Sequence, residues 1–351
     1  MAEIAADFTA RFGLAPEVDA SAPGRVNLLG EHTDYNEGLV LPVATPQRTH
    51  VALRVAAEGA DRFESTQLAH AAPERLGRFR AYLDGCLAAL RDAGFELPAH
   101  WMLVDSAVPM GAGLSSSAAL EVATLRALRA RHSLPLDDKA LALLGQQAEN
   151  RYVGVRSGIL DQMAASLGAS DAMLRLDTRS LATELLPLPP HAAVLVLDSG
   201  VRRSLKDSAY NQRREECETA ARLLGVRALR DCTDLDTLAS LPPPLAQRAR
   251  HVITENARVA QVSATTDAAS LGRLMSASHE SLRRDFAVSI PALDALVAAL
   301  QAQPGVFGAK LTGAGFGGAV VALVARAAAD RAGEQALAAY EAQGFRGRRL
   351  L

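Results

Sequence analysis

The chain has 351 residues, of which 49% are hydrophobic, so it is long enough for about two domains of roughly 150 residues, each with its own core. Its 37 Lys and Arg against 39 Asp and Glu leave a net charge of -2, which excludes a basic field for binding nucleic acid or an anionic membrane. Three scattered cysteines, an N-terminus unlike a signal peptide and the lack of a long apolar run lead us to expect a cytoplasmic protein without disulfides.

A short segment near the N-terminus carries many polar groups between apolar residues. It spans residues 24–38 and reads GRVNLLGEHTDYNEG. Arg25, Glu31, His32 and Asp34 are interleaved there with Val and Leu, whereas a surface turn would explain only the glycines. The pattern predicts a strand that ends in a polar pocket.

Strands and helices alternate through the first half of the chain. Residues 39–55 indicate strands broken at Pro42 and Pro46, and residues 101–108 indicate a further strand. Apolar spacing predicts helices over 117–131 and 138–150. Strands are expected at 173–178 and 193–201, around a Pro-containing turn at 187–190. We place the domain boundary in this region, with an N-terminal domain over 1–180 and a C-terminal domain over 181–351.

The second half is predicted to be rich in helices. Their periods fall near 210–224, 245–265, 267–284 and 291–301. The segment LPPPL at 241–245 is interpreted as a rigid turn between two of these helices and not as a polyproline ligand.

Two glycine-rich loops suggest phosphate binding. The first, VPMGAGLSSSAALEVA at 108–123, places Gly111 and Gly113 after a strand and three serines at the start of a helix, where backbone N–H groups can bind phosphate. It is not a Walker A sequence, and a Ser-rich helix cap is the alternative. The second, KLTGAGFGGAV at 310–320, is equally compatible with a tight hairpin. Together the two loops favour a nucleotide held from both sides.

Phosphoryl transfer also needs a metal ligand and a group that orients or deprotonates the acceptor hydroxyl. Glu149 and Asp161 are the candidates in the first domain, because both acids have apolar or glycine neighbours. Each of them alone is also compatible with a solvated or helix-capping acid.

Several segments resemble the GHMP kinases and, within them, the galactokinases. They are GRVNLLGEHTDYNEGLVLP, VPMGAGLSSSAALEVA and KLTGAGFGGAVVAL, together with QQAENRYVG, GILDQM, SAYNQRREECE, HVITENARV and ESLRRDFAVSIPALD, and they cover about residues 20–325. The resemblance implies a two-domain α+β fold: an N-terminal domain with a left-handed βαβ unit, a ferredoxin-like C-terminal domain, and an active site in the cleft between them.

The resemblance also implies roles for single residues. Asp161 matches the family's catalytic aspartate, and Arg25 matches the arginine that pairs with it. The residues that match contacts to the sugar are Glu31, His32, Asp34, Gly158 and Tyr210. A pyranose presents a ring of hydroxyls, and each needs a donor or acceptor when it is buried, which explains the polar groups of 24–38.

ATP and Mg²⁺ are the cofactors that the resemblance implies. Ser117 and Glu149 match the Mg²⁺ ligands of related kinases, and their oxygen atoms are the kind of ligand that this ion prefers. Four residues would line the triphosphate: Gly111, Gly113, Ser115 and Ser116. Phe79 and Tyr82 stand where the family has aromatic residues near the adenine.

The expected activity is ATP-dependent phosphorylation of α-D-galactose at its anomeric hydroxyl by a monomer. A kinase for a neighbouring sugar, such as N-acetylgalactosamine or L-arabinose, and a non-catalytic sensor of sugar and ATP are the alternatives. The chain departs from the family at Ser157, where a cysteine is frequent, at Ala209, where glutamate is common, and in a short 56–78 segment. These departures concern the choice of sugar and the adenine site.

Overall fold

The computed structural model describes residues 2–68, 71–202 and 206–351. Its contacts divide the chain into two compact units. The first comprises Met1–Arg25, Ala44–Met110 and Ser115–Gly168, and the second comprises Val26–Val43, Gly111–Leu114 and Ala169–Leu351. The units therefore alternate along the chain. The expected division into 1–180 and 181–351 concerns contiguous sequence domains and stays a prediction.

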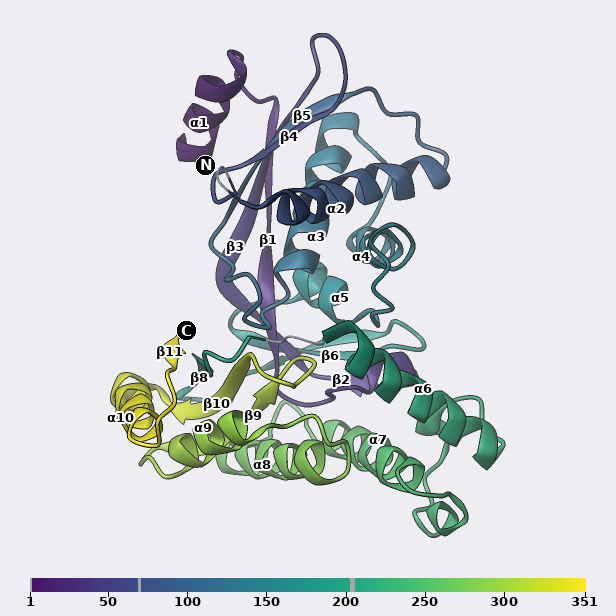
Figure 1. Cartoon of the computed structure of the whole chain (residues 1–351), viewed down its shortest axis with the longest axis vertical. Coiled ribbons are helices and arrows are strands. Elements are labelled where there is room, and N and C mark those ends of the chain that lie inside the picture. Colours follow the sequence, from purple (N-terminus) through teal and green to yellow (C-terminus); the bar gives the residue numbers. More distant parts are fainter. Residues whose placement is uncertain (1, 69–70, 203–205) are drawn as a thin grey trace. The chain divides into compact units, whose positions relative to one another are not determined.

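The first unit contains most of four strands and a set of helices (Figure 1). The strands are β1 (Val18–Asn27), β3 (Pro42–Val55), β4 (Arg62–Ser65) and β5 (His100–Ser106). The helices are α1 (Ala2–Phe12), α2 (Pro73–Asp92), α3 (Ser116–His132), α4 (Asp138–Gln147), the π-helix η2 (Ala148–Val153) and α5 (Leu160–Leu167). Strand β3 pairs antiparallel with β5 and also pairs with β1. Strand β4 pairs parallel with β5, so β4, α2 and β5 form a βαβ unit.

Alternation along β5 explains why both faces of this sheet are buried. Met102 and Val104 pack in the core formed with α2, α3 and α4, whereas Leu103 between them packs against Phe8 of α1. Successive side chains of a strand point to opposite faces, so an unbroken apolar run requires a cover on each side. Figure 1 shows α1 on one side of the strands and α2 and α3 on the other.

The expected break at Pro46 is wrong, because β3 continues through it. Pro46 is exposed and lies between the pairing of Val43 with Met173 and the pairing that begins at Thr49 with Ser106. A proline without a backbone N–H is tolerated where no ladder bond is lost. The predicted helices over 117–131 and 138–150 are confirmed as α3 and α4, but the second one changes to the π-helix η2 after Gln147.

The second unit contains two groups of strands. Strands β2 (Leu39–Val40), β6 (Ala172–Asp177) and β7 (Thr183–Pro187) pair antiparallel with β6 in the middle. The other group has the order β11-β8-β10-β9 and is also antiparallel. Its strands are β8 (Ala192–Asp198), β9 (Val306–Thr312), β10 (Ala319–Ala325) and β11 (Arg348–Arg349). The loop 313–318 joins β9 to β10, so the hairpin interpretation of the second glycine loop is confirmed.

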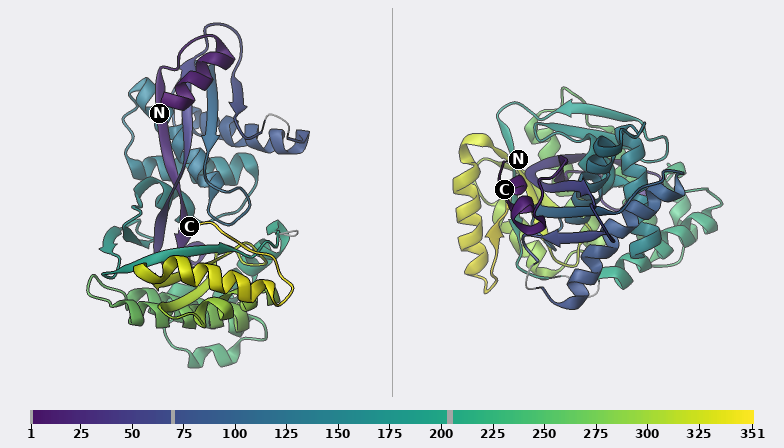
Figure 2. Two further views of the ribbon diagram at one scale, coloured as in Figure 1. Left: turned by 90° about the vertical axis from the view of Figure 1, so that its left-hand side faces the viewer. Right: turned by 90° about the horizontal axis from the view of Figure 1, so that it is seen from above.

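Helices supply the rest of the second unit. They are α6 (Lys206–Leu224), α7 (Leu245–Ala260), α8 (Ala268–Arg284), α9 (Pro291–Gln301) and α10 (Ala329–Glu341), with short 3₁₀ helices η1 (Asp34–Asn36), η3 (Leu229–Asp231), η4 (Asp236–Ser240) and η5 (Arg326–Ala328). Figures 1 and 2 show α8 and α9 along the strands β9 and β10, and α10 beside β8. Helix α8 approaches β9 closely at Gly272 and Gly308: a Cβ on Gly308 would overlap the backbone of Gly272, and a Cβ on Gly272 would overlap the backbone of Phe307. Small residues thus bring this helix onto the sheet.

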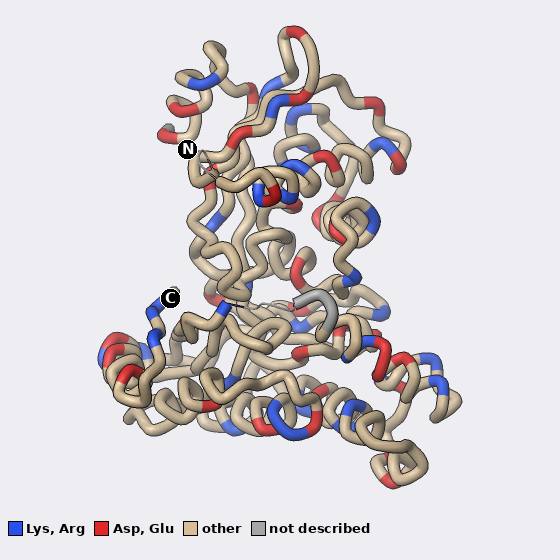
Figure 3. Tube along the Cα trace, viewed as in Figure 1, with Lys and Arg blue, Asp and Glu red and all other residues tan. Residues whose placement is uncertain are grey.

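Charged residues of both signs are interspersed within each unit (Figure 3). Within the described ranges, no helix combines the length and the apolar character that a membrane span requires. The three cysteines, Cys86, Cys217 and Cys232, are buried free thiols.

Candidate active site

Asp161 and Arg25 form an ion pair inside the first unit. Asp161 is the second residue of α5, and Arg25 lies on β1 with only 6% of its surface exposed. The Arg25 Nε donates to Asp161 Oδ1 at 2.8 Å, and its Nη2 lies 2.6 Å from the same oxygen. Both donors hold the same oxygen of the carboxylate beside the guanidinium group. The structure therefore brings the predicted catalytic pair together.

The second oxygen of Asp161 is held by Ser115. The Ser115 hydroxyl donates to Asp161 Oδ2 at 2.5 Å. Ser115 precedes α3 with a φ of 56°, in the left-handed region that non-glycine residues rarely adopt, and this backbone turn directs its side chain to the acid. Sequence reasoning assigned Ser115 to the triphosphate and did not foresee its contact with Asp161.

Glu149 lies in the π-helix η2 and is 6% exposed. Its Oε2 accepts from the Ser157 hydroxyl at 2.7 Å and from the Gln162 amide at 3.0 Å. Burial raises the pKa of Glu149, and the nearby charge of Asp161 raises it further, against the opposing effect of the Ser157 hydrogen bond. Ser117, the other predicted metal ligand, is close enough to Glu149 to lower its pKa slightly.

Glu121 is a third acid in this region, which sequence reasoning missed. It is fully buried on α3, and its Oε2 accepts from the same Gln162 amide at 2.9 Å. Burial, followed by the charges of Glu149 and Asp161, raises its pKa well above the ordinary value. A usable signal was present, since Glu121 stands among apolar residues one helical turn after Ser117. We call Glu121, Glu149 and Asp161 the carboxylate cluster.

Phe79 and Tyr82 lie on α2, half-buried against the core of the first unit. Burial, with smaller contributions from the charges of Glu149 and Glu121, raises the pKa of Tyr82. The contact of Tyr82 with adenine stays a prediction. Gly158 is buried in the loop before α5, and its contact with sugar also stays a prediction.

The first glycine loop has the backbone that phosphate binding requires. Gly111 and Gly113 have φ values of 78° and 86°, which favour glycine, and a Cβ at Gly111 would meet open space. Ser116 is the first residue of α3, a helix whose N-terminal N–H groups can bind an anion. The roles of these residues toward a triphosphate stay predictions.

The second unit holds residues 30–39, which we call the signature loop. Glu31 is 4% exposed, and its Oε1 accepts from Lys310 Nζ at 3.2 Å and from the Gly313 N–H at 2.7 Å. Lys310 is fully buried on β9. Sequence reasoning placed this lysine only in a glycine-rich loop and missed its pairing with Glu31, because the two residues are far apart in the chain.

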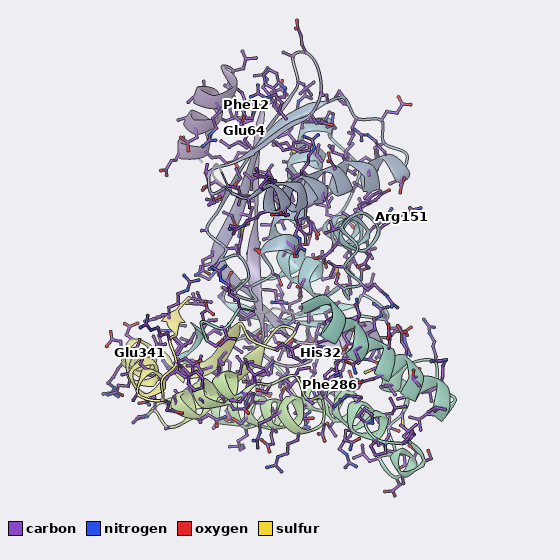
Figure 4. The ribbon with its side chains drawn as sticks, in the orientation of Figure 1. Phe12, His32, Glu64, Arg151, Phe286 and Glu341 are labelled. Atoms are coloured by element: carbon purple, nitrogen blue, oxygen red, sulfur yellow. The ribbon has the colours of Figure 1, made fainter. Side chains whose placement is uncertain are left out.

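Aromatic rings surround His32 in the same unit. Its ring centroid lies 4.7 Å from that of Phe286 and 5.6 Å from that of Tyr210, and its Nδ1 shares a hydrogen bond of 2.8 Å with the Tyr35 hydroxyl. Figure 4 shows His32 and Phe286 beside each other. Burial lowers the pKa of His32 well below its usual value, so the ring is neutral at pH 7. The predicted sugar contacts His32 and Tyr210 are therefore neighbours.

Asp34 begins the 3₁₀ helix η1 within the signature loop. Thr178, directly after β6, donates its hydroxyl to the backbone oxygens of Asp34 at 3.1 Å and of Gly38 at 2.9 Å. Arg230 donates to the backbone oxygen of Glu37 and also pairs with Asp177. Side chains distant in sequence thus hold the loop on which Asp34 lies.

Three family models match the chain. They are the galactokinase galactose-binding signature over residues 6–55, the N-terminal domain of GHMP kinases over 81–169, and the C-terminal domain of GHMP kinases over 259–342. The latter two models define the class, which is a small-molecule kinase of the GHMP type. The predicted two-domain α+β fold is confirmed. As kinases, members of this class use ATP as a phosphoryl donor.

Individual relatives are more specific. The chain is 47% identical to a galactokinase of Roseiflexus over 93% of this chain and 88% of the relative, and 42% identical to a galactokinase of Chloroflexus aurantiacus over 91% and 87%. The solved galactokinase of Lactococcus lactis, in complex with galactose, has a TM-score of 0.89 and 30% identity and covers 99% of this chain and 96% of its own. The chain belongs to the galactokinases of the GHMP kinase family.

Proposed function

We propose that this chain transfers the γ-phosphoryl group of ATP to the anomeric hydroxyl of α-D-galactose, giving galactose 1-phosphate and ADP. The observation that carries the proposal is the carboxylate of Asp161, fixed by Arg25 on one oxygen and by Ser115 on the other. It is supported by the galactose-binding signature matched over residues 6–55.

Asp161 acts on the sugar hydroxyl that is phosphorylated. Oδ2 of Asp161 has a second lone pair beyond the one that Ser115 engages, so Asp161 can accept a hydrogen bond from this hydroxyl through Oδ2. It either removes the proton or directs the oxygen toward phosphorus, since a loose transition state asks little of a base. The positive charge of Arg25 offsets negative charge beside the reacting oxygen.

Ser117 and Glu149 are the residues that would hold Mg²⁺. Among the described residues, there is no group of three or more His, Cys, Asp or Glu side chains that could hold a metal ion without other ligands. Glu149 nevertheless offers a buried carboxylate, and Ser117 offers a hydroxyl close enough to influence the pKa of that carboxylate. Such a pair suits an ion that keeps several waters and uses one or two protein oxygens together with phosphates. When bound, Mg²⁺ would neutralise charge on the phosphate oxygens.

Recognition of the sugar is assigned to the signature loop and its neighbours. Glu31, His32, Asp34 and Tyr210, with Gly158, provide donors and acceptors for the hydroxyls of galactose. In glucose the 4-hydroxyl is equatorial and would lose the hydrogen bond that we assign to Asp34, at about 1–3 kcal/mol per broken buried hydrogen bond. Gly111, Gly113 and Ser116 bind the triphosphate through backbone N–H groups, and Phe79 and Tyr82 lie near the adenine.

We also assign the enzyme to the cytoplasm, which its buried free thiols support. We assign it to the monomeric state as well.

The test is kcat/KM for ATP-dependent turnover of galactose, glucose and N-acetylgalactosamine under one set of conditions, with the product identified. Loss of two buried hydrogen bonds predicts about 10²–10⁴-fold lower kcat/KM for glucose, because about 1.4 kcal/mol is tenfold. Glucose within tenfold of galactose would contradict the role of Asp34. N-acetylgalactosamine above galactose would favour a kinase for that sugar. Binding of galactose and ATP without turnover would favour the sensor.

A further inference from the structure

Helix α7 holds the backbone of the signature loop. His251 and Glu255 are four residues apart, so they lie on the same side of the helix, and Asn256 follows Glu255 directly. Glu255 Oε1 accepts from the Gly30 N–H at 2.8 Å, and Asn256 Oδ1 accepts from the Leu39 N–H at 2.7 Å. Both ends of residues 30–39 are therefore attached to one helix.

His251 holds the peptide group between these ends. Its Nε2 lies 3.0 Å from the backbone oxygen of Glu31. A carbonyl oxygen only accepts, so Nε2 carries the hydrogen and donates it. The imidazole is fully buried and packs on Phe286, with ring centroids 4.6 Å apart. This hydrogen bond fixes the backbone at the residue assigned to the sugar.

Lys310 holds the side chain of Glu31 from a different element. The pleat of β9 sends Ala309 and Leu311 into the core of the second unit and Lys310 to the opposite face of the sheet. There Nζ donates to the backbone oxygen of Asn27 at 3.2 Å and to Glu31 Oε1 at 3.2 Å. The Gly313 N–H donates to the same oxygen. Among the described residues, the hydrogen bonds to this carboxylate all go to Oε1.

The charges explain why these contacts are strong enough to orient a side chain. A fully buried ammonium is costly unless a counter-charge and further acceptors surround it. Lys310 has both in Glu31 and Asn27. Glu255 is balanced in the same way: burial would raise its pKa, but the nearby charges, that of Arg258 first, lower it to about 2. Glu31 and Glu255 thus each have a cationic partner.

We propose that Lys310 and His251 are positioning residues for galactose recognition, which fix Glu31 by its Oε1 and its backbone oxygen so that Oε2 is presented to a hydroxyl of the sugar. The inference rests on the proposed function and deepens it, because it assigns one oxygen of one acid to the ligand.

The experiment compares two matched pairs of variants by calorimetric titration with galactose and, separately, with Mg·ADP. Lys310→Met keeps the volume but removes the charge, whereas Lys310→Arg keeps the charge. His251→Phe keeps the ring but removes the donor, whereas His251→Gln keeps a donor. We expect Lys310→Met and His251→Phe to raise the Kd for galactose about tenfold or more, as the loss of a buried partner implies. The conservative variant of each pair should recover most of the affinity, and the Kd for Mg·ADP should stay within about twofold of wild type.

Monodeoxy galactoses separate positioning from general loosening. The hydroxyl that contacts Glu31 is the one whose removal weakens binding to wild type but weakens binding to Lys310→Met much less, because that variant has already lost the oriented oxygen. Unfolding curves without sugar identify variants that are not folded, and the His251 pair then carries the test.

Folded Lys310→Met and His251→Phe that bind galactose within twofold of wild type would overturn the inference, while the proposed function would stand. Equal loss of affinity for galactose and Mg·ADP would overturn it as well. A wild-type chain that does not bind galactose would overturn the proposed function and this inference with it.

Discussion

The carboxylate cluster of the first unit and the signature loop of the second unit balance their charges in opposite ways. In the signature loop and the helix that holds it, Glu31 is paired with Lys310, Glu255 with Arg258, and Glu37 with Arg179. In the carboxylate cluster, Arg25 pairs with Asp161, but the described hydrogen bonds to Glu121 and Glu149 come from neutral amides and hydroxyls. Two buried acids therefore depend on neutral donors.

The difference corresponds to the ligands that we assign to the two regions. A neutral sugar needs oriented donors and acceptors whose charges are already balanced, because an unpaired buried charge would be costly. A divalent cation needs oxygen ligands that carry negative charge. Burial raises the pKa of Glu149 and of Glu121, and the described hydrogen bonds to these two acids come from neutral groups. Three predictions test this contrast.

The largest effect is expected at the one paired acid of the carboxylate cluster. Asp161→Asn keeps the shape of the side chain but removes the charge opposite Arg25. We expect kcat to fall by about 10² or more, as for other positioned proton acceptors, while the Kd for galactose stays within a few-fold. Steady-state kinetics and calorimetry measure the two quantities. Asp7→Asn, at an exposed position on α1, is the matched control. A variant that keeps half of the wild-type kcat would exclude Asp161 from this role.

A smaller effect is expected at the residues assigned to Mg²⁺. Ser117→Ala and Glu149→Ala should each weaken binding of Mg·ATP about tenfold, because each removes one hard oxygen ligand. Binding of galactose should change much less, since its contacts are assigned mainly to the signature loop. Calorimetric titration with and without Mg²⁺ provides the measurement, and Glu96→Ala at an exposed position is the control. If both variants keep the metal dependence of wild type, neither residue is a ligand.

The smallest effect is expected in the stability of the metal-free protein. The folded protein raises the pKa of Glu121, so the stability associated with this acid is full below its ordinary value of 4.5 and is lost as the pH rises through the folded value. Glu121→Gln removes the titration and keeps a similar shape. Its Tm relative to wild type should therefore increase from pH 5 to pH 8, with about 2–4 °C for each kcal/mol.

The control for this stability experiment is Glu96→Gln, which changes an exposed acid in the same unit. Its Tm relative to wild type should not vary between the two pH values. If the Tm difference between Glu121→Gln and wild type is also the same at both pH values, the folded protein does not raise the pKa of Glu121. The electrostatic contrast between the two regions would then be wrong.

The sequence by itself determined the elements and most of the candidate residues. Periodicity predicted α3, and apolar runs predicted β5, β6 and β8, because these patterns are local and depend on one face or both faces being buried. The motifs around Arg25 and Asp161 predicted the ion pair, although 136 positions separate the two residues in the chain. The family resemblance supplied that pairing, since no spacing rule could have done so.

Only the tertiary structure decided which side chains hold these candidates in place. Ser115 contacts Asp161 because its backbone adopts a left-handed turn, and Gln162 joins Glu121 to Glu149 because α3, η2 and α5 pack together. Lys310 reaches Glu31 from a strand 279 positions later in the chain. Such contacts depend on how distant segments pack, and local sequence patterns carry information only about nearest neighbours along a helix or strand. The sequence therefore indicated the groups to which we assign the chemistry, whereas only the tertiary structure showed which side chains hold them.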